Sequence, residues 1–234
     1  MMKTVLKRLF AMLLVAGMIC AFAVPKDVQA ASSTKKKLKA LVNCMSGYEW
    51  YLLMSNDIEE GEVREVPMSK VVMAKAAAFN CPRTYVSEYG EWEWEILYTV
   101  STKKLKAMAK KMFGTAVTYK NLPKMSAEDV IGVMDVYRNE KGKVELYAWE
   151  GETETAFDTI KISYKKSGTG YKITKDMFCG YWGIHEYYKH KKANYRIVYT
   201  VEKNKASSYG YVITGMSVEY LENLTIPYDD EGQG

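Results

Sequence analysis

The sequence predicts an α+β fold in which two or three N-terminal helices pack on one face of a C-terminal antiparallel β-meander. Before residue 114, apolar residues recur every three or four positions, which indicates amphipathic helices. After residue 131, short alternating segments are joined by tight turns, which indicates antiparallel strands. We therefore expect a single α+β domain over residues 31–224, with a helical half at 34–114 and a strand-rich half at 131–221.

The first two helices are predicted from apolar spacing and capping residues. The first runs from Thr34 to about Asn56, although Gly47 in its interior costs about 1 kcal/mol relative to alanine. The second follows Ser69, whose hydroxyl can cap the first turn, and runs through Phe79.

A strand and a third helix complete the first half. Trp92 and Trp94 alternate with acidic residues in a segment that ends at Val100, so this segment is predicted to be a strand with one aromatic face. The third helix opens at Ser101 and ends at Gly114, because glycine takes the left-handed conformation that stops a helix.

The strand-rich half is predicted from alternation and turn residues. Ser167-Gly168-Thr169-Gly170 is a hairpin signal, because glycine supplies the positive φ angles of tight turns. The expected strands are 133–137, 144–149, 156–164, 171–178, 195–201 and 209–220. Residues 225–234 are expected to form a disordered acidic tail.

This order of elements, over roughly residues 69–221, resembles the cystatin-like and nuclear-transport-factor-like α+β folds. In both folds, helices cradle one curved sheet. The resemblance implies a layout only, because such folds host unrelated functions, and it assigns no residue a role.

The first 30 residues have the three parts of a secretory signal peptide. A positive region, Lys3 to Arg8, precedes the uncharged, mostly apolar stretch Leu9–Val24. Small residues follow, and we expect cleavage after Ala30. One alternative is a retained membrane anchor, but an apolar stretch of 16 residues is shorter than the roughly 20 that span the hydrocarbon core. The other is a lipoprotein processed at Cys20, where the preceding Ile19 fits poorly.

Charge and cysteine content limit the partners and the chemistry. The net charge of +5 belongs largely to the signal peptide, and the remainder carries +2, so we expect no nucleic-acid partner. After cleavage no transmembrane helix is expected. Three cysteines remain in an oxidising compartment, and a disulfide between Cys44 and Cys81 is the preferred pairing; the alternative is three small buried side chains.

No catalytic residue, metal site or cofactor is predicted. His185 and His190 are five residues apart, which on a helix places them about 140° from each other, too far to share a metal ion. Cys179 has histidines only a few residues downstream, whereas a thiol protease needs a distant histidine folded back onto the cysteine. Alternating glutamates at 91–95 and 150–154 are typical of a solvated sheet face.

Aromatic residues are the remaining signal for function. The chain has 19 tyrosines and five tryptophans, and exposed rings of this kind bind sugars and peptides by stacking. We expect Trp92 and Trp94 to be core residues. The speculative ligand-binding residues lie in the connector after residue 180, namely Tyr181, Trp182, Tyr187 and Tyr188.

Together these features predict an exported, non-enzymatic binding or interaction domain. We expect it to be secreted or held at the cell surface, with a cell-wall polymer, a glycan or a protein as its partner. The alternative is a cell-wall or glycan hydrolase that uses carboxylates which the sequence does not identify.

Overall fold

The computed structural model describes residues 26–55, 58–88, 95–124, 135–149 and 155–226. Its contacts divide the chain into two compact units, Met1–Leu38 and Lys39–Gly234. The described part of the first unit belongs to helix α2 (Lys26–Asn43), and the second unit holds the other described helices and strands. Trp92, Trp94 and the end of the predicted acidic tail lie outside the described residues.

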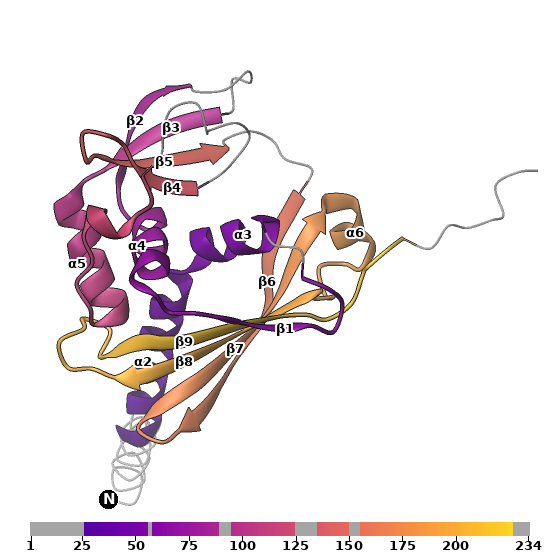
Figure 1. Ribbon diagram of the computed structural model, residues 1–234. Helices are drawn as coiled ribbons and strands as arrows, with labels where there is room; N and C mark the ends of the chain where they lie inside the picture. Colours follow the sequence, from indigo (N-terminus) through magenta and orange to yellow (C-terminus); the bar gives the residue numbers. More distant parts are fainter. Residues whose placement is uncertain (1–25, 56–57, 89–94, 125–134, 150–154, 227–234) are drawn as a thin grey trace, which may run out of the picture. The chain divides into compact units, whose positions relative to one another are not determined.

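In the second unit, helices are interspersed among the strands along the chain (Figure 1). The helices are α3 (Ser46–Ser55), α4 (Lys70–Phe79), α5 (Thr102–Phe113), the short 3-10 helix η1 (Tyr119–Asn121) and α6 (Trp182–Tyr187). The strands are β1 (Val63–Val66), β2 (Arg83–Glu88), β3 (Glu95–Val100), β4 (Asp135–Arg138), β5 (Val144–Trp149), β6 (Thr155–Ser167), β7 (Gly170–Tyr181), β8 (Tyr195–Lys203) and β9 (Tyr211–Tyr220).

The α+β class is confirmed, but the expectation of a single meander is wrong. The described strands form a five-stranded sheet, ordered β1-β9-β8-β7-β6, and a four-stranded sheet, ordered β2-β3-β5-β4. All neighbouring strands are antiparallel. The second sheet forms because β2 and β3, from the predicted helical half, pair with each other, and β3 pairs with β5. This two-sheet arrangement also differs from the one-sheet layout of the cystatin-like and nuclear-transport-factor-like folds.

The helices are also not confined to the N-terminal half, because α6 follows β7 directly. The predicted first helix is wrong in its length, since α2 ends at Asn43 and α3 begins at Ser46. Gly47 has a packing role there. A Cβ atom at Gly47 would lie 3.0 Å from the Cβ atom of Phe79, so glycine lets α3 approach α4 closely.

The other two helices begin and end as their capping residues predict. The Ser69 hydroxyl accepts a hydrogen bond from the backbone N–H of Val72 at the start of α4. Gly114 ends α5 in the left-handed conformation, with a φ of 70°. A capping hydroxyl thus marks the start of α4 and a glycine marks the end of α5, whereas Ser101 makes no side-chain capping bond at the start of α5.

The end of the large sheet anchors α6. Ile184 and Tyr188 pack against a buried cluster of Ala156, Phe178 and Leu224, which joins β6, β7 and the segment after β9. Among the described residues, no helix is long and apolar enough to cross a membrane.

Candidate functional site

Three large aromatic side chains are exposed around α6, and we call Tyr181, Trp182 and Tyr187 the α6 surface. Their exposed fractions are 53%, 47% and 50%. Tyr188 differs from these three, because its ring packs on the Phe178 cluster and its hydroxyl donates a hydrogen bond to the Thr225 carbonyl at 3.0 Å. The structure thus places three of the four predicted ligand-binding residues at the surface and uses the fourth as an anchor.

The chain turns directly from β7 into α6 at Tyr181, and a glycine makes the packing of this turn possible. A Cβ atom at Gly183 would lie 2.6 Å from the Tyr181 ring, so the ring can lie across Gly183 only because no side chain is there. Tyr181 therefore lies across the first turn of α6.

Asn194 fixes the return of the chain from α6 to β8. Its side-chain amide donates to the Cys179 carbonyl at 2.8 Å and accepts from the Cys179 N–H at 2.9 Å. Its backbone N–H donates to Met177, and its carbonyl accepts from Leu221. A buried asparagine with these bonds holds both ends of the α6 segment in place.

The helix ends in a Schellman motif, in which the last backbone groups bond back across the left-handed residue. The Lys189 N–H donates to Glu186 at 2.8 Å, and the His190 N–H donates to His185 at 3.0 Å. Lys189 and His190 have positive φ angles of 52° and 57°, which non-glycine residues adopt at a cost of roughly 1–3 kcal/mol each. This motif brings His190 back over the end of the helix, toward His185.

The two histidines consequently meet, contrary to the expectation from a continuous helix. The Nδ1 atoms of His185 and His190 are 3.0 Å apart, and the ring centres are 4.3 Å apart with the planes at 87°. His185 is buried, with 2% of its surface exposed, whereas His190 is exposed. The chain contains only two histidines, so the fold pairs both of them.

Aromatic rings hold His185 in one orientation. The Phe178 ring stacks on the His185 imidazole at 4.5 Å, and the Trp182 ring centre is 5.6 Å from the ring centres of both histidines. Burial and the neighbouring His190 lower the pKa of His185, while Asp158 and Glu186 oppose this change. The His185 Nε2 atom has no hydrogen-bond partner, and its closest carboxylate oxygen, Asp158 Oδ2, is 3.9 Å away.

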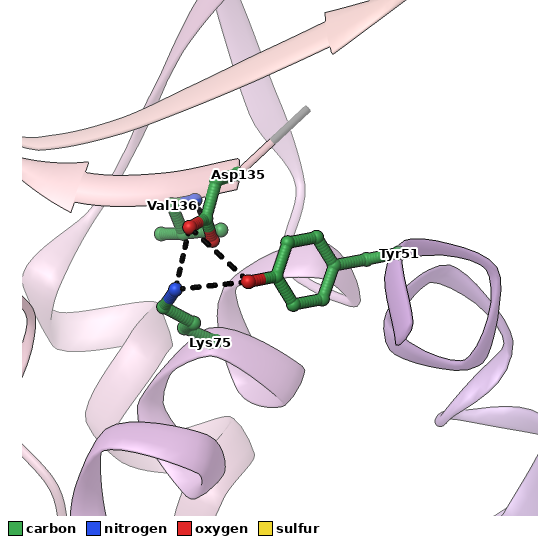
Figure 2. Close-up of polar contacts among 4 residues, drawn as sticks. All are labelled: Tyr51, Lys75, Asp135 and Val136. Carbon is green, nitrogen blue, oxygen red and sulfur yellow. Dashed lines mark hydrogen bonds and ion pairs between the residues drawn. The ribbon is translucent and has the colours of Figure 1, made fainter. Parts of the chain in front are cut away.

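Two buried ion pairs elsewhere in the unit have their charges neutralised by partners. In Figure 2, the Lys75 ammonium donates to Asp135 Oδ2 at 2.5 Å and to the Tyr51 hydroxyl at 3.3 Å, and the Val136 N–H donates to Asp135 Oδ1 at 2.7 Å. This network joins α3, α4 and β4. Because each charge has a close partner, the network is a structural connection between these elements.

The second pair is buried completely. The Lys175 ammonium donates to both oxygens of Glu49 at 2.6 and 2.8 Å, and the Tyr199 hydroxyl also donates to that carboxylate. Neither charged side chain has more than 1% of its surface exposed. Burial raises the pKa of Glu49, although Lys175 and Tyr199 oppose the rise. Sequence reasoning missed this pair, although Lys175 lies on the same face of β7 as the buried Ile173 and Met177.

None of the three cysteines that the structure describes is bonded to another, and two of them have raised pKa values. Cys44, Cys81 and Cys179 are free, so the predicted Cys44–Cys81 disulfide is not present in the structure. The Cys44 thiol is instead 3.2 Å from the Ala40 carbonyl and 2.9 Å from the Tyr209 hydroxyl. Burial raises the pKa of Cys81 and of Cys179 to about 11, whereas a nucleophilic cysteine needs a lowered pKa.

Comparisons with known proteins assign the chain to no family. No protein-family model, no curated protein sequence and no solved structure matches it. Function must therefore be argued from the chemistry of the α6 surface and of the histidine pair beside it.

Proposed function

We propose that this protein is an exported binding domain that holds an extracellular anionic glycan against the α6 surface. The observation that carries the proposal is the exposure of three large aromatic rings within seven residues, on a segment anchored from below by Ile184 and Tyr188. Tyrosine and tryptophan offer a large contact area and lose little side-chain entropy on binding. A rigid support keeps that loss small.

The chemistry of the segment favours a sugar with negative charge. The flat C–H faces of sugar rings stack on aromatic rings, and their hydroxyl groups remain at the wet edge. Lys189 and Lys191, which follow α6 along the chain, are exposed, whereas Lys192 pairs with Glu222. Exposed cations attract an anionic chain and speed its encounter with the surface, in a way that added salt weakens.

Export supports an extracellular ligand and rests on the predicted signal peptide. The hydrolase alternative needs a pair of available carboxylates. Glu49 and Asp135, the buried carboxylates of the described residues, are each paired with a lysine. The buried carboxylates therefore offer no free pair, whereas the α6 surface offers three exposed rings for binding.

Affinity measurements with soluble neutral and anionic polysaccharides test the proposal. We expect Trp182→Ala and Tyr187→Ala each to weaken binding by about 10-fold or more, as central aromatic contacts usually do. The matched control is Tyr85→Ala, because Tyr85 is an equally exposed tyrosine on β2, with 56% of its surface accessible. Binding should fall further at high ionic strength.

Two results would contradict the proposal. Equal losses of affinity in the Tyr85 and Trp182 variants would show that the α6 surface has no special role. If the protein bound none of the polysaccharides, a glycan would not be its ligand. Release of new reducing ends from a polysaccharide would instead favour the hydrolase.

A further inference from the structure

We propose that His185 and His190 form a chelating site for a late first-row divalent cation, Cu²⁺ above all, bound between their Nδ1 atoms. The site is independent of glycan binding, because it uses the imidazoles beside the α6 surface and none of the three rings that define it.

The distance between the two nitrogens fits two ligands of one ion. Bonds from such metals to imidazole are about 2.0–2.1 Å long, so ligands at a right angle stand about 2.9 Å apart and ligands at the tetrahedral angle about 3.4 Å. The observed separation of the Nδ1 atoms is 3.0 Å. A right angle is the geometry of tetragonal copper and nickel sites.

The separation of the ring centres distinguishes this arrangement from a straight hydrogen bond. Because each nitrogen is about 1.1 Å from its ring centre, a straight N–H···N bond would separate the centres by about 5.2 Å, and a right-angled ion by about 4.5 Å. The centres of His185 and His190 are 4.3 Å apart. The observed separation is therefore shorter than that of a straight hydrogen bond and close to that of two ligands at a right angle around one ion.

The surroundings favour the tautomer that metal binding requires. With its proton on Nε2, His185 presents the Nδ1 lone pair to the ion, and the N–H faces the Asp158 carboxylate 3.9 Å away. At 3.9 Å this carboxylate is too distant for a direct hydrogen bond, and it favours a proton on Nε2 through its negative charge. Phe178 stacks on the same ring, and the Schellman motif fixes His190, so the two ligands are largely in place before an ion binds.

The protein supplies two ligands, and water completes the coordination. Among the residues that the structure describes, no group of three or more histidine, cysteine or acidic side chains could hold a metal ion. Because His190 is exposed, water can reach the remaining positions. The site therefore favours copper, which forms the strongest complexes of this series with nitrogen ligands, over the oxygen-preferring Ca²⁺ and Mg²⁺.

Titration of the purified protein, prepared without a histidine tag, with Cu²⁺ tests the site by calorimetry and tryptophan fluorescence. We expect one ion per chain, a dissociation constant on the order of micromolar, and about 100-fold weaker binding in His190→Ala, since the second ligand raises the effective concentration of the first. His190 is exposed, so its loss leaves the core intact. Lys191→Ala is the matched control and should bind as the unmodified protein does.

Trp182 locates the ion, since its ring centre is 5.6 Å from those of both histidines. Cu²⁺ should quench its emission, and Trp182→Phe should lose that part of the quenching while calorimetry still detects one ion. Unchanged affinity in His190→Ala, or quenching that is the same in Trp182→Phe, would place the ion elsewhere and overturn the proposal. Binding of Mg²⁺ with equal affinity would also overturn it.

Discussion

Replacing Lys175 with methionine removes the cation from a fully buried ion pair. In the folded protein, the Lys175 ammonium makes two hydrogen bonds to Glu49, and neither side chain is exposed to water by more than 1%. Methionine has a similar length, so it leaves little empty volume. The variant therefore isolates the cost of a buried carboxylate that has lost its counter-charge.

The expected loss is large. Removing one partner of a buried ion pair typically costs about 3–5 kcal/mol, because the remaining charge stays away from water without compensation. For a chain of this length, each kcal/mol lowers the melting temperature by about 2–4 °C, so the variant should melt roughly 6–20 °C lower. The Tyr199 hydroxyl still bonds to Glu49 and keeps the loss from being greater.

The loss should depend on pH. Burial raises the pKa of Glu49, and Lys175 opposes the rise, so the pKa increases further in the variant. An acid whose folded-state pKa is raised stabilises the fold below its unfolded pKa, about 4.3, and this contribution disappears as pH rises through the folded value. We therefore expect Lys175→Met to be least destabilising near about pH 4 and most destabilising above neutrality.

Urea denaturation followed by circular dichroism at several pH values measures this effect. Lys172→Met is the matched control, because Lys172 lies on the same strand but is exposed, and its replacement should change stability by less than about 0.5 kcal/mol. Equal stability of the two variants at neutral pH would refute the reasoning, since the buried lysine would then contribute no more than a surface lysine.

Three further experiments test other parts of the unit. Lys189→Gly should raise the free energy of unfolding by about 1 kcal/mol, because glycine adopts the left-handed conformation at the end of α6 without strain; a lower urea midpoint would contradict this. In the folded protein at pH 8, a thiol reagent should modify Cys44 but should modify Cys81 and Cys179 only after unfolding, because burial raises the pKa of both thiols to about 11. Equal modification rates for all three cysteines would be inconsistent with the fold. Asn194→Ala should lower the free energy of unfolding by about 1–3 kcal/mol and expose the α6 segment to proteases, because buried backbone groups of Cys179 lose their hydrogen-bond partners. An unchanged digestion pattern would show that the asparagine does not hold that segment.

Much of the local structure could be predicted from the sequence because it depends on neighbouring residues. Ser69 and Gly114 mark helix ends through their own hydrogen bonding and backbone freedom, and the glycines of the β6–β7 turn mark a hairpin. The break between α2 and α3 was not predicted, because the apolar spacing continues across it. Pairing of β3 with β2 and with β5 was missed for a related reason, since strand partners are set by long-range contacts.

The candidate site was predicted only in part. Its aromatic residues were recognised by type, and three of them are exposed. The contact between His185 and His190 was not predicted. A glycine at the left-handed position of the Schellman motif would have indicated the helix end, but Lys189 occupies that position.

The sequence by itself determined the α+β class, most of the strands and the two capped helices, since these follow from periodicity and from side chains that act on adjacent backbone. Only the tertiary structure decided that there are two sheets, that Lys175 meets Glu49, and that the two histidines converge. The physical reason is distance along the chain: Glu49 and Lys175 are 126 residues apart, so only the packing of α3 near β7 brings their charges together. The histidine pair is local in sequence, but its geometry depends on a strained turn that the surrounding core and Asn194 hold in place.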